Sequence, residues 1–262
     1  MQGFYRERLD SGLSSSTVQK IHHVLHKSPA RAVRWDLIPR NPADAVKAPN
    51  PEPKEMHPLS AQEARRLLAT ARGDRLEALY ALAVHTGMRR GELLALRWSE
   101  VSLGEPGVVR VHRTLTRTED GNSVALGDPK TKKSGRTVRL TPGTRNALKR
   151  HRTRQAEERL KAGSAYQNED LVFATTCGTP INPSNLRNRS FVPLLKEAGL
   201  PKITFHDLRH TTASLLFSKN VHPKFVQELL GHASVAFTLD TYSHMLPGMG
   251  GQAADAMGEA LE

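Results

Sequence analysis

A proline-rich stretch near residue 50 divides the chain and limits what either side of it can fold into. Residues 48–58 read APNPEPKEMHP, with four prolines and no apolar periodicity. Proline fixes φ and removes a backbone donor, so such a stretch favours an extended linker over a helix or a strand. We therefore expect a small first domain at 1–48, a linker at 49–58, a main domain at 59–247 and a tail at 248–262.

The first domain is predicted to be helical. Ser14–Ser16 supply N-cap candidates, and Val18 and Leu25 belong to an apolar series at helical spacing. Pro29 should break or kink this helix because it cannot donate the i→i−4 hydrogen bond. A second short helix is expected over residues 32–37.

The main domain is predicted to be mainly helical with a small antiparallel β-sheet, which is an α+β fold. Ser60 and Glu63 form a capping box that opens its first helix. Further helices are expected at 75–85, 89–97, 144–161, 184–198, 206–219, 223–230 and 235–244. Alternating apolar residues predict strands at 108–112, 123–126 and 137–140, joined by turns.

Positive charge is concentrated in one part of the chain. The formal net charge is +12, and residues 110–161 contain 15 Lys or Arg against 5 Asp or Glu, which is +10 of that total. Positive charge concentrated in this way indicates a surface that binds phosphates, and not merely a generic solvated surface.

Three motifs near the C-terminus carry the chemistry. HDLRH occupies 206–210, LLGH occupies 229–232, and Tyr242 follows ten residues after the last histidine. Arginine binds phosphate through two parallel hydrogen bonds, and a tyrosine hydroxyl can act as a nucleophile where the developing charge is stabilised. The set indicates a tyrosine that attacks a phosphodiester. Of the four tyrosines, Tyr242 follows these boxes most closely, although its spacing also allows a core position.

Arg89 and Glu92 form a second candidate pair upstream. Their i, i+3 spacing puts both on one helical stripe that is otherwise apolar, so Arg89 should be partly buried. The pair could be a structural ion pair, or Glu92 could aim Arg89 at a phosphate oxygen. We favour the second interpretation.

His206 and Arg209 lie one helical turn apart and can project from the start of a helix into one pocket. Two further histidines, His210 and His232, compete as additional donors. We favour His232, because Gly231 ends the preceding helix and leaves the next residue at a chain reversal.

Taken in order, these boxes resemble those of the tyrosine recombinases, the phage integrase family. TGMRRGEL at 86–93 and PKTKKSGRTVRL at 129–140 match the two upstream boxes, and the three C-terminal motifs match the rest. The resemblance runs from about Leu13 to Met245. It implies a tyrosine-recombinase catalytic domain preceded by a helical core-DNA-binding domain, which is expected to be incomplete here.

The resemblance also implies roles for individual residues. Tyr242 would attack DNA to give a 3′-phosphotyrosine and a free 5′-hydroxyl, without metal, cofactor or ATP. The implied catalytic set is Arg89 and Arg209 as phosphate clamps, Lys130 as general acid, His206 in proton transfer, His232 as a further donor, and Tyr242. Lys132, Lys133 and Arg136 are DNA-backbone candidates; taken alone, the lysines would be a solvated hairpin tip.

The implied partner is double-stranded DNA, bound by a homotetramer on two synapsed sites, with accessory DNA-bending or directionality factors. One cysteine excludes an intramolecular disulfide, and no apolar run reaches membrane-spanning length. We expect no membrane partner and a cytoplasmic, nucleoid-associated protein. Two alternatives stay open: strand relaxation of the type IB topoisomerase kind, and a non-catalytic DNA-binding remnant of an integrase.

Overall fold

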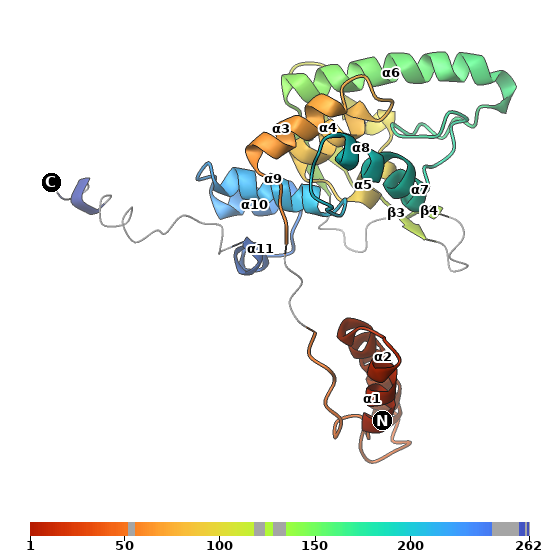
Figure 1. The fold of residues 1–262 in the computed structure, drawn as a ribbon, viewed down its shortest axis with the longest axis vertical. Helices are drawn as coiled ribbons and strands as arrows, with labels where there is room; N and C mark the ends of the chain where they lie inside the picture. Colours follow the sequence, from red (N-terminus) through yellow and green to blue (C-terminus); the bar gives the residue numbers. More distant parts are fainter. Residues whose placement is uncertain (52–55, 118–123, 128–134, 243–256, 260, 262) are drawn as a thin grey trace. The chain divides into compact units, whose positions relative to one another are not determined.

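The computed structural model describes the chain except for residues 52–55, 118–123, 128–134, 243–256, 260 and 262 (Figure 1). It divides into two compact units, Met1–Glu55 and Met56–Glu262. The division falls within the proline-rich stretch. Each unit has its own buried side chains and is described separately below.

The first unit is a pair of helices, α1 (Gln2–Asp10) and α2 (Ser15–Arg34). The Ser14 hydroxyl accepts a hydrogen bond from the Thr17 amide at 3.3 Å, which caps α2. The Tyr5 ring is buried between the helices, and its hydroxyl is hydrogen-bonded to Nδ1 of His22 at 3.1 Å. We did not predict α1, because Tyr5 is its only buried residue and its sequence therefore carries little apolar periodicity.

The separate helix predicted at 32–37 was wrong. Helix α2 continues through Pro29 to Arg34, so the helix is not broken at the proline. A proline removes only one ladder hydrogen bond, and the turn before it is supported from outside the helix. Asn41 Nδ2 donates to the His26 carbonyl oxygen at 3.1 Å, which satisfies an acceptor next to the disturbed turn.

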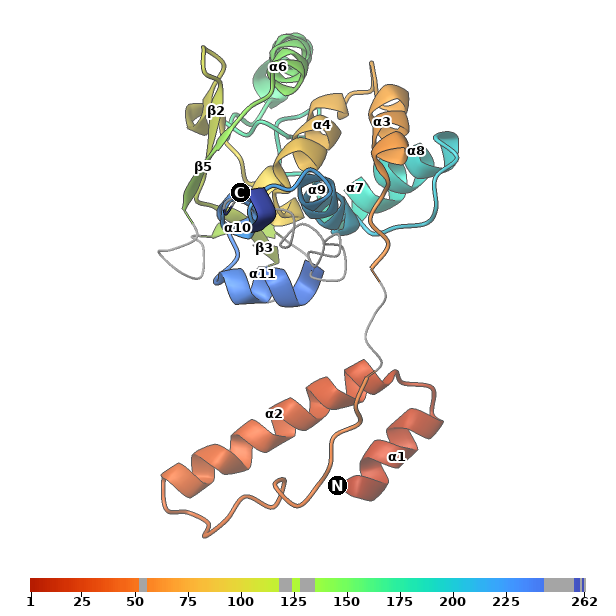
Figure 2. The ribbon, with the colours of Figure 1, turned by 90° about the vertical axis from the view of Figure 1, so that its left-hand side faces the viewer.

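The second unit is built around one helix, α4 (Glu77–Thr86), of which eight of ten residues are buried. It packs against α6 (Pro142–Ala162) and α9 (Asp207–Phe217), and Figure 2 shows it surrounded by these and by α3 (Ala61–Thr70). A helix enclosed in this way is apolar on every side, as the sequence EALYALAVHT is.

The remaining helices follow the predicted order, and the helix at Pro223–Leu230 alone among them keeps the predicted bounds. Helix α5 (Arg90–Leu94) is shorter than expected. The segment predicted at 184–198 is α7 (Pro183–Leu186), a π-helical turn at Arg187–Phe191, and α8 (Val192–Glu197). The last two are α10 (Pro223–Leu230) and α11 (Val235–Tyr242).

The β structure is antiparallel, as predicted, but forms two sheets. The first has the order β1 (Val101–Ser102), β2 (Val108–Val111), β5 (Arg136–Arg139), and the second pairs β3 (Thr114–Arg117) with β4 (Val124–Gly127). Val109 is paired with Val138 and both are buried, so the first sheet turns one face to the core. The fold is mostly helical with small antiparallel sheets, which confirms the predicted class. No helix in the described ranges is long and apolar enough to cross a bilayer.

Candidate active site

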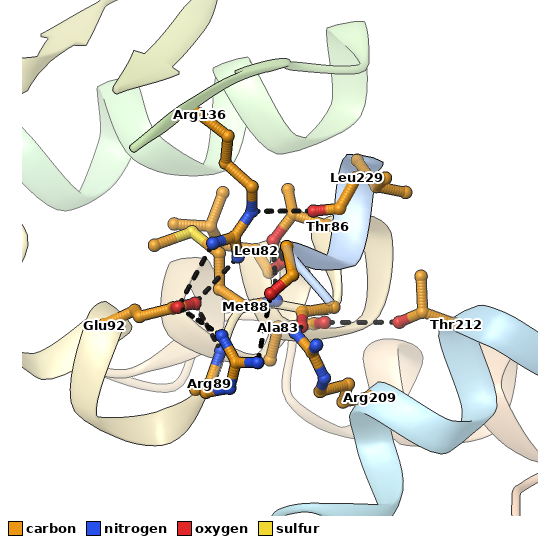
Figure 3. A network of polar contacts seen from close by, with 12 residues as sticks. Leu82, Ala83, Thr86, Met88, Arg89, Glu92, Arg136, Arg209, Thr212 and Leu229 are labelled. Carbon is orange, nitrogen blue, oxygen red and sulfur yellow. Dashed lines mark hydrogen bonds and ion pairs between the residues drawn. The ribbon is translucent and has the colours of Figure 1, made fainter. Parts of the chain in front are cut away.

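The first half of the site is a carboxylate held between two arginines (Figure 3). Arg89 lies at the N-cap of α5, and the Glu92 carboxylate accepts from the Arg89 amide at 2.8 Å and from its Nη1 at 2.9 Å. The predicted ion pair is therefore present, but Arg89 precedes the helix and does not lie on its buried stripe. Its side chain is 41% exposed, against 7% for Glu92. The guanidinium can therefore meet a ligand while the carboxylate holds it from behind.

Arg136, the second partner of Glu92, begins strand β5. Its Nη1 and Nη2 donate to the two carboxylate oxygens at 3.1 and 2.7 Å, and its Nε donates to the Leu229 carbonyl oxygen at 2.7 Å. Its side chain is only 9% exposed. Burial raises the pKa of Glu92, but the hydrogen bonds and charges of Arg136 and Arg89 outweigh it, so the carboxyl stays ionised.

Arg209, on α9, is 2% exposed. Its Nη1 donates to the Gly87 carbonyl oxygen at 2.7 Å, while its Nη2 is buried without any hydrogen-bond partner in the described part of the chain. Burial, together with the positive charge of Arg89, lowers the pKa of Arg209 to about 9. A buried cation with an unpaired donor, next to a second cation, is the arrangement that an incoming anion would relieve.

Gly87 explains why Arg209 finds a backbone carbonyl at this place. It ends α4 in the left-handed conformation, at φ +61°, and a Cβ there would collide with Leu230 and Thr212. The close approach of three helices at this glycine is thus what sets Arg209 beside the loop that leads into Arg89.

Tyr242, the last residue of α11, is 1% exposed. Its hydroxyl is hydrogen-bonded to Nδ1 of His210 at 2.7 Å, and its ring packs with Phe217 and neighbouring apolar side chains. Burial raises the pKa of Tyr242, and the charge of Arg209 acts in the opposite direction. The phenol is therefore close enough to Arg209 for the charge to affect its pKa, but the hydroxyl points inward and stays protonated.

The histidine that contacts the phenol hydroxyl is His210, whereas the sequence favoured His232 as the further donor. The His232 ring lies parallel to the Tyr242 ring at 6.3 Å between centroids, and its Nδ1 is hydrogen-bonded to Thr238 Oγ1 at 2.8 Å. His206 packs edge-on against His210 at 4.9 Å.

The structure thus brings together Arg89, Glu92, Arg136, His206, Arg209, His210, His232 and Tyr242 from α5, β5, α9, the end of α10 and α11. Lys130, Lys132 and Lys133 lie outside the described residues. Sequence reasoning missed the central position of Arg136 and the contact of His210. No local pattern signals either, because the Leu229 carbonyl that binds Arg136 lies far along the chain and helix phase alone does not rank two histidines.

The comparisons with known proteins agree with this arrangement. The model of the phage integrase family matches residues 58–248, which includes every residue of the site. The chain belongs to the phage integrase family. Some relatives of this tyrosine recombinase are named integrases, and others are named transposases of transposons.

Two curated relatives and one solved structure illustrate the likeness. A XerC-like tyrosine recombinase of Caldanaerobacter subterraneus subsp. tengcongensis is 36% identical over 263 residues, covering 94% of this chain and 67% of the relative. An integrase of Streptomyces ambofaciens is 32% identical over 242 residues, covering 88% and 60%. The chain thus spans about two thirds or less of these relatives' length. The Tn1549 transposon integrase has the same fold, with a TM-score of 0.78 at 21% identity, covering 100% of this chain and 84% of that one.

The histidines of this tyrosine recombinase predict how its stability depends on pH. Burial, with nearby positive charge, lowers the pKa of His210 to about 4 and that of His232 to about 3, from the ordinary value of 6.5. Below about pH 6.5 these two histidines are protonated in the unfolded chain but stay neutral in the folded chain. The free energy of unfolding therefore decreases as the pH falls from 7 to 5. Urea unfolding across this range should show the loss.

His232→Asn should reduce the pH dependence of the free energy of unfolding by nearly one proton, whereas His57→Asn, at an exposed position, is the control and should leave it unchanged. The same pH dependence in both variants would contradict the assignment.

Proposed function

We propose that this chain is a site-specific DNA recombinase that cuts and rejoins DNA through a 3′-phosphotyrosine at Tyr242, using cationic side chains in place of a metal ion. The observation that carries the proposal is the buried Arg209 guanidinium, whose Nη2 has no partner in the described residues. A buried donor that lacks a partner costs on the order of 1–3 kcal/mol, and more when it is charged. A phosphodiester oxygen would supply the missing acceptor and the missing negative charge together.

The chemistry follows from the charges around that position. Glu92 carries one negative charge against the positive charges of Arg89, Arg136 and Arg209, so the pocket has a net charge of +2. In the proposed step the Tyr242 oxygen attacks phosphorus, its proton leaves to a histidine, and the 5′-oxygen departs with a proton. Arg89 and Arg209 would stabilise the additional negative charge of the five-coordinate transition state.

The departing 5′-oxygen needs a proton donor, and we assign that role to Lys130 by its position in the family motif. His206 is proposed to assist proton transfer to and from the nucleophile, and His232 is proposed to donate to the phosphate. The 5′-hydroxyl of another strand reverses the reaction. The phosphotyrosine conserves the energy of the broken bond, so exchange of strands needs no ATP.

The phenol must change place before it can attack. In the resting arrangement its hydroxyl bonds to His210 and its ring is enclosed, so a phosphate cannot reach the oxygen. A movement of α11 that exposes Tyr242 is therefore part of the proposal. The cost of losing one hydrogen bond and the burial of one aromatic ring is a few kcal/mol, which the binding of DNA or of a second subunit can offset.

Double-stranded DNA is the proposed partner, contacted by both units and by the basic region at 110–161. The Tn1549 transposon integrase has been solved in complex with a circular intermediate DNA, and lambda integrase (75–356) as a dimer bound to a core site. We further propose a homotetramer on two synapsed sites, with residues 1–48 as part of a core-DNA-binding domain and residues 248–262 as a tail.

The test is a covalent capture. Duplexes bound by the protein are first selected from a random library, and the selected site is then prepared with a nick next to the scissile phosphate so that the 5′-hydroxyl product is lost. We expect a protein–DNA adduct that survives denaturation, and peptide mapping should place it at Tyr242. Relaxation of supercoiled DNA regardless of sequence would instead favour a topoisomerase, and binding without an adduct would favour a non-catalytic module.

The basic region provides a further prediction. Lys132→Ala or Lys133→Ala should each flatten the dependence of log K on log salt by about 0.9, because each lysine that contacts a phosphate releases one counterion. Equilibrium binding of the selected duplex between 50 and 300 mM salt measures the slope. A slope equal to that of the unsubstituted protein would show that these two lysines do not touch DNA.

A further inference from the structure

Arg136 differs from the other basic residues of its strand. It begins β5, where Arg139 lies three residues further on and is exposed. The Arg136 side chain is 9% exposed, and each of its three guanidinium nitrogens already has a partner within 3.1 Å. A side chain that turns its donors inward in this way contributes little to a surface that binds a phosphate backbone.

The partners of Arg136 are themselves parts of the site. Two of its nitrogens bind the carboxylate that also binds Arg89, and the third binds the Leu229 carbonyl oxygen near the end of α10. Arg89 in turn donates from Nη2 to the Gly231 carbonyl oxygen at 3.2 Å. Both arginines therefore bind the Glu92 carboxylate on one side and carbonyl oxygens at the end of α10 on the other (Figure 3).

A glycine at the end of α10 leaves room for the Arg136 side chain. Gly231 has φ +67°, and a Cβ on it would lie 2.8 Å from Arg136 Nη1. The turn that leads from α10 into His232 therefore packs directly against the guanidinium. The side-chain amide of Gln227 stabilises the same turn by donating to the His232 carbonyl oxygen at 2.5 Å. Loss of the Arg136 guanidinium would leave a gap behind this turn.

We infer that Arg136 is a positioning residue, which orients Arg89 through Glu92 and fixes the turn before His232, and that it does not contact DNA. The inference rests on the proposed function, because it assigns Arg136 a role in the same cleavage step. Without Arg136, Glu92 keeps Arg89 as its one ion-pair partner among the described residues, and Arg89 is drawn towards the carboxylate and away from the phosphate. The bidentate geometry needs a guanidinium, since a lysine ammonium cannot bind both carboxylate oxygens and the carbonyl at once.

The experiment compares Arg136→Met and Arg136→Lys with Arg139→Met as the matched control on the same strand. For each protein we measure the salt dependence of binding to the selected duplex and the single-turnover rate of adduct formation on the nicked duplex. Arg136→Met should lower the rate by about 10²–10³-fold, as loss of an oriented donor does, and leave the salt slope unchanged. Arg136→Lys should fold and recover part of the rate. A salt slope reduced by about 0.9 in Arg136→Met, which removes the charge, would overturn the inference.

A double substitution separates positioning from a general loss of structure. If Arg136 acts through Glu92, then removing it from a Glu92→Gln protein should cost much less in rate than removing it from the original protein. Equal costs in the two backgrounds would contradict the inference. If neither the unsubstituted protein nor Arg139→Met forms an adduct, the proposed function fails. The salt slope of the Arg136 variants is measured by binding alone, so it still shows whether this side chain contacts DNA.

Discussion

Tyr242→Phe should abolish covalent attachment to DNA and leave affinity for the duplex within about threefold. The substitution removes a single oxygen, which is the proposed nucleophile and the hydrogen-bond partner of His210. The ring still fills its place beside Phe217, so the free energy of unfolding should change by only about 1 kcal/mol. The measurement is adduct formation on the nicked duplex, followed by denaturing electrophoresis, with equilibrium binding measured in parallel.

Tyr166→Phe is the control, since Tyr166 lies on another part of the second unit, near Arg159, and should form the adduct at the normal rate. An adduct of undiminished yield from Tyr242→Phe would remove this residue from the mechanism, and a second peptide in the map would show which side chain replaces it.

Arg209→Met should change activity and stability in opposite directions. The guanidinium is buried with one nitrogen unpaired, and burial together with the charge of Arg89 already disfavours its charged form. An apolar chain of similar length removes that cost, so we expect the protein to be stabilised by on the order of 1–2 kcal/mol, or a few degrees in Tm, despite the lost bond to Gly87. Cleavage should fall by about 10³-fold or more, because one of two phosphate clamps is lost.

Arg209→Lys separates charge from shape in this comparison. It keeps a positive charge but cannot bind both the Gly87 carbonyl and a phosphate oxygen, so it should cleave slowly without becoming more stable. A Met variant that is less stable than the original protein, or that still cleaves at more than a tenth of the normal rate, would show that Arg209 is a structural residue only.

The sequence predicted well what depends on local spacing. The capping box at Ser60 and Glu63 is present, α10 has the predicted bounds, and Glu92 binds Arg89 across three residues as the spacing required. These features depend on residues within one or two turns, where the helical period alone fixes which side chains meet.

Features that depend on distant parts of the chain escaped prediction. Arg136 was assigned to the DNA surface because its neighbours in sequence are basic, yet its position is decided by Leu229, which is 93 residues away. Helix α2 passes through Pro29 with the support of Asn41, and no rule of local propensity includes such an outside partner. Likewise, the contact of His210 with Tyr242 joins two residues that are 32 positions apart, and no local spacing predicts it.

Gly87 has a consequence for reading other sequences of this kind. It stands where a Cβ would meet Leu230 and Thr212, and its carbonyl is the anchor for the deepest arginine. Any larger residue at this place would be strained by the positive φ and would have to displace the Leu230 side chain. In a relative that keeps all the charged residues but has lost this one glycine, we therefore expect the backbone that carries the arginine's acceptor to be shifted.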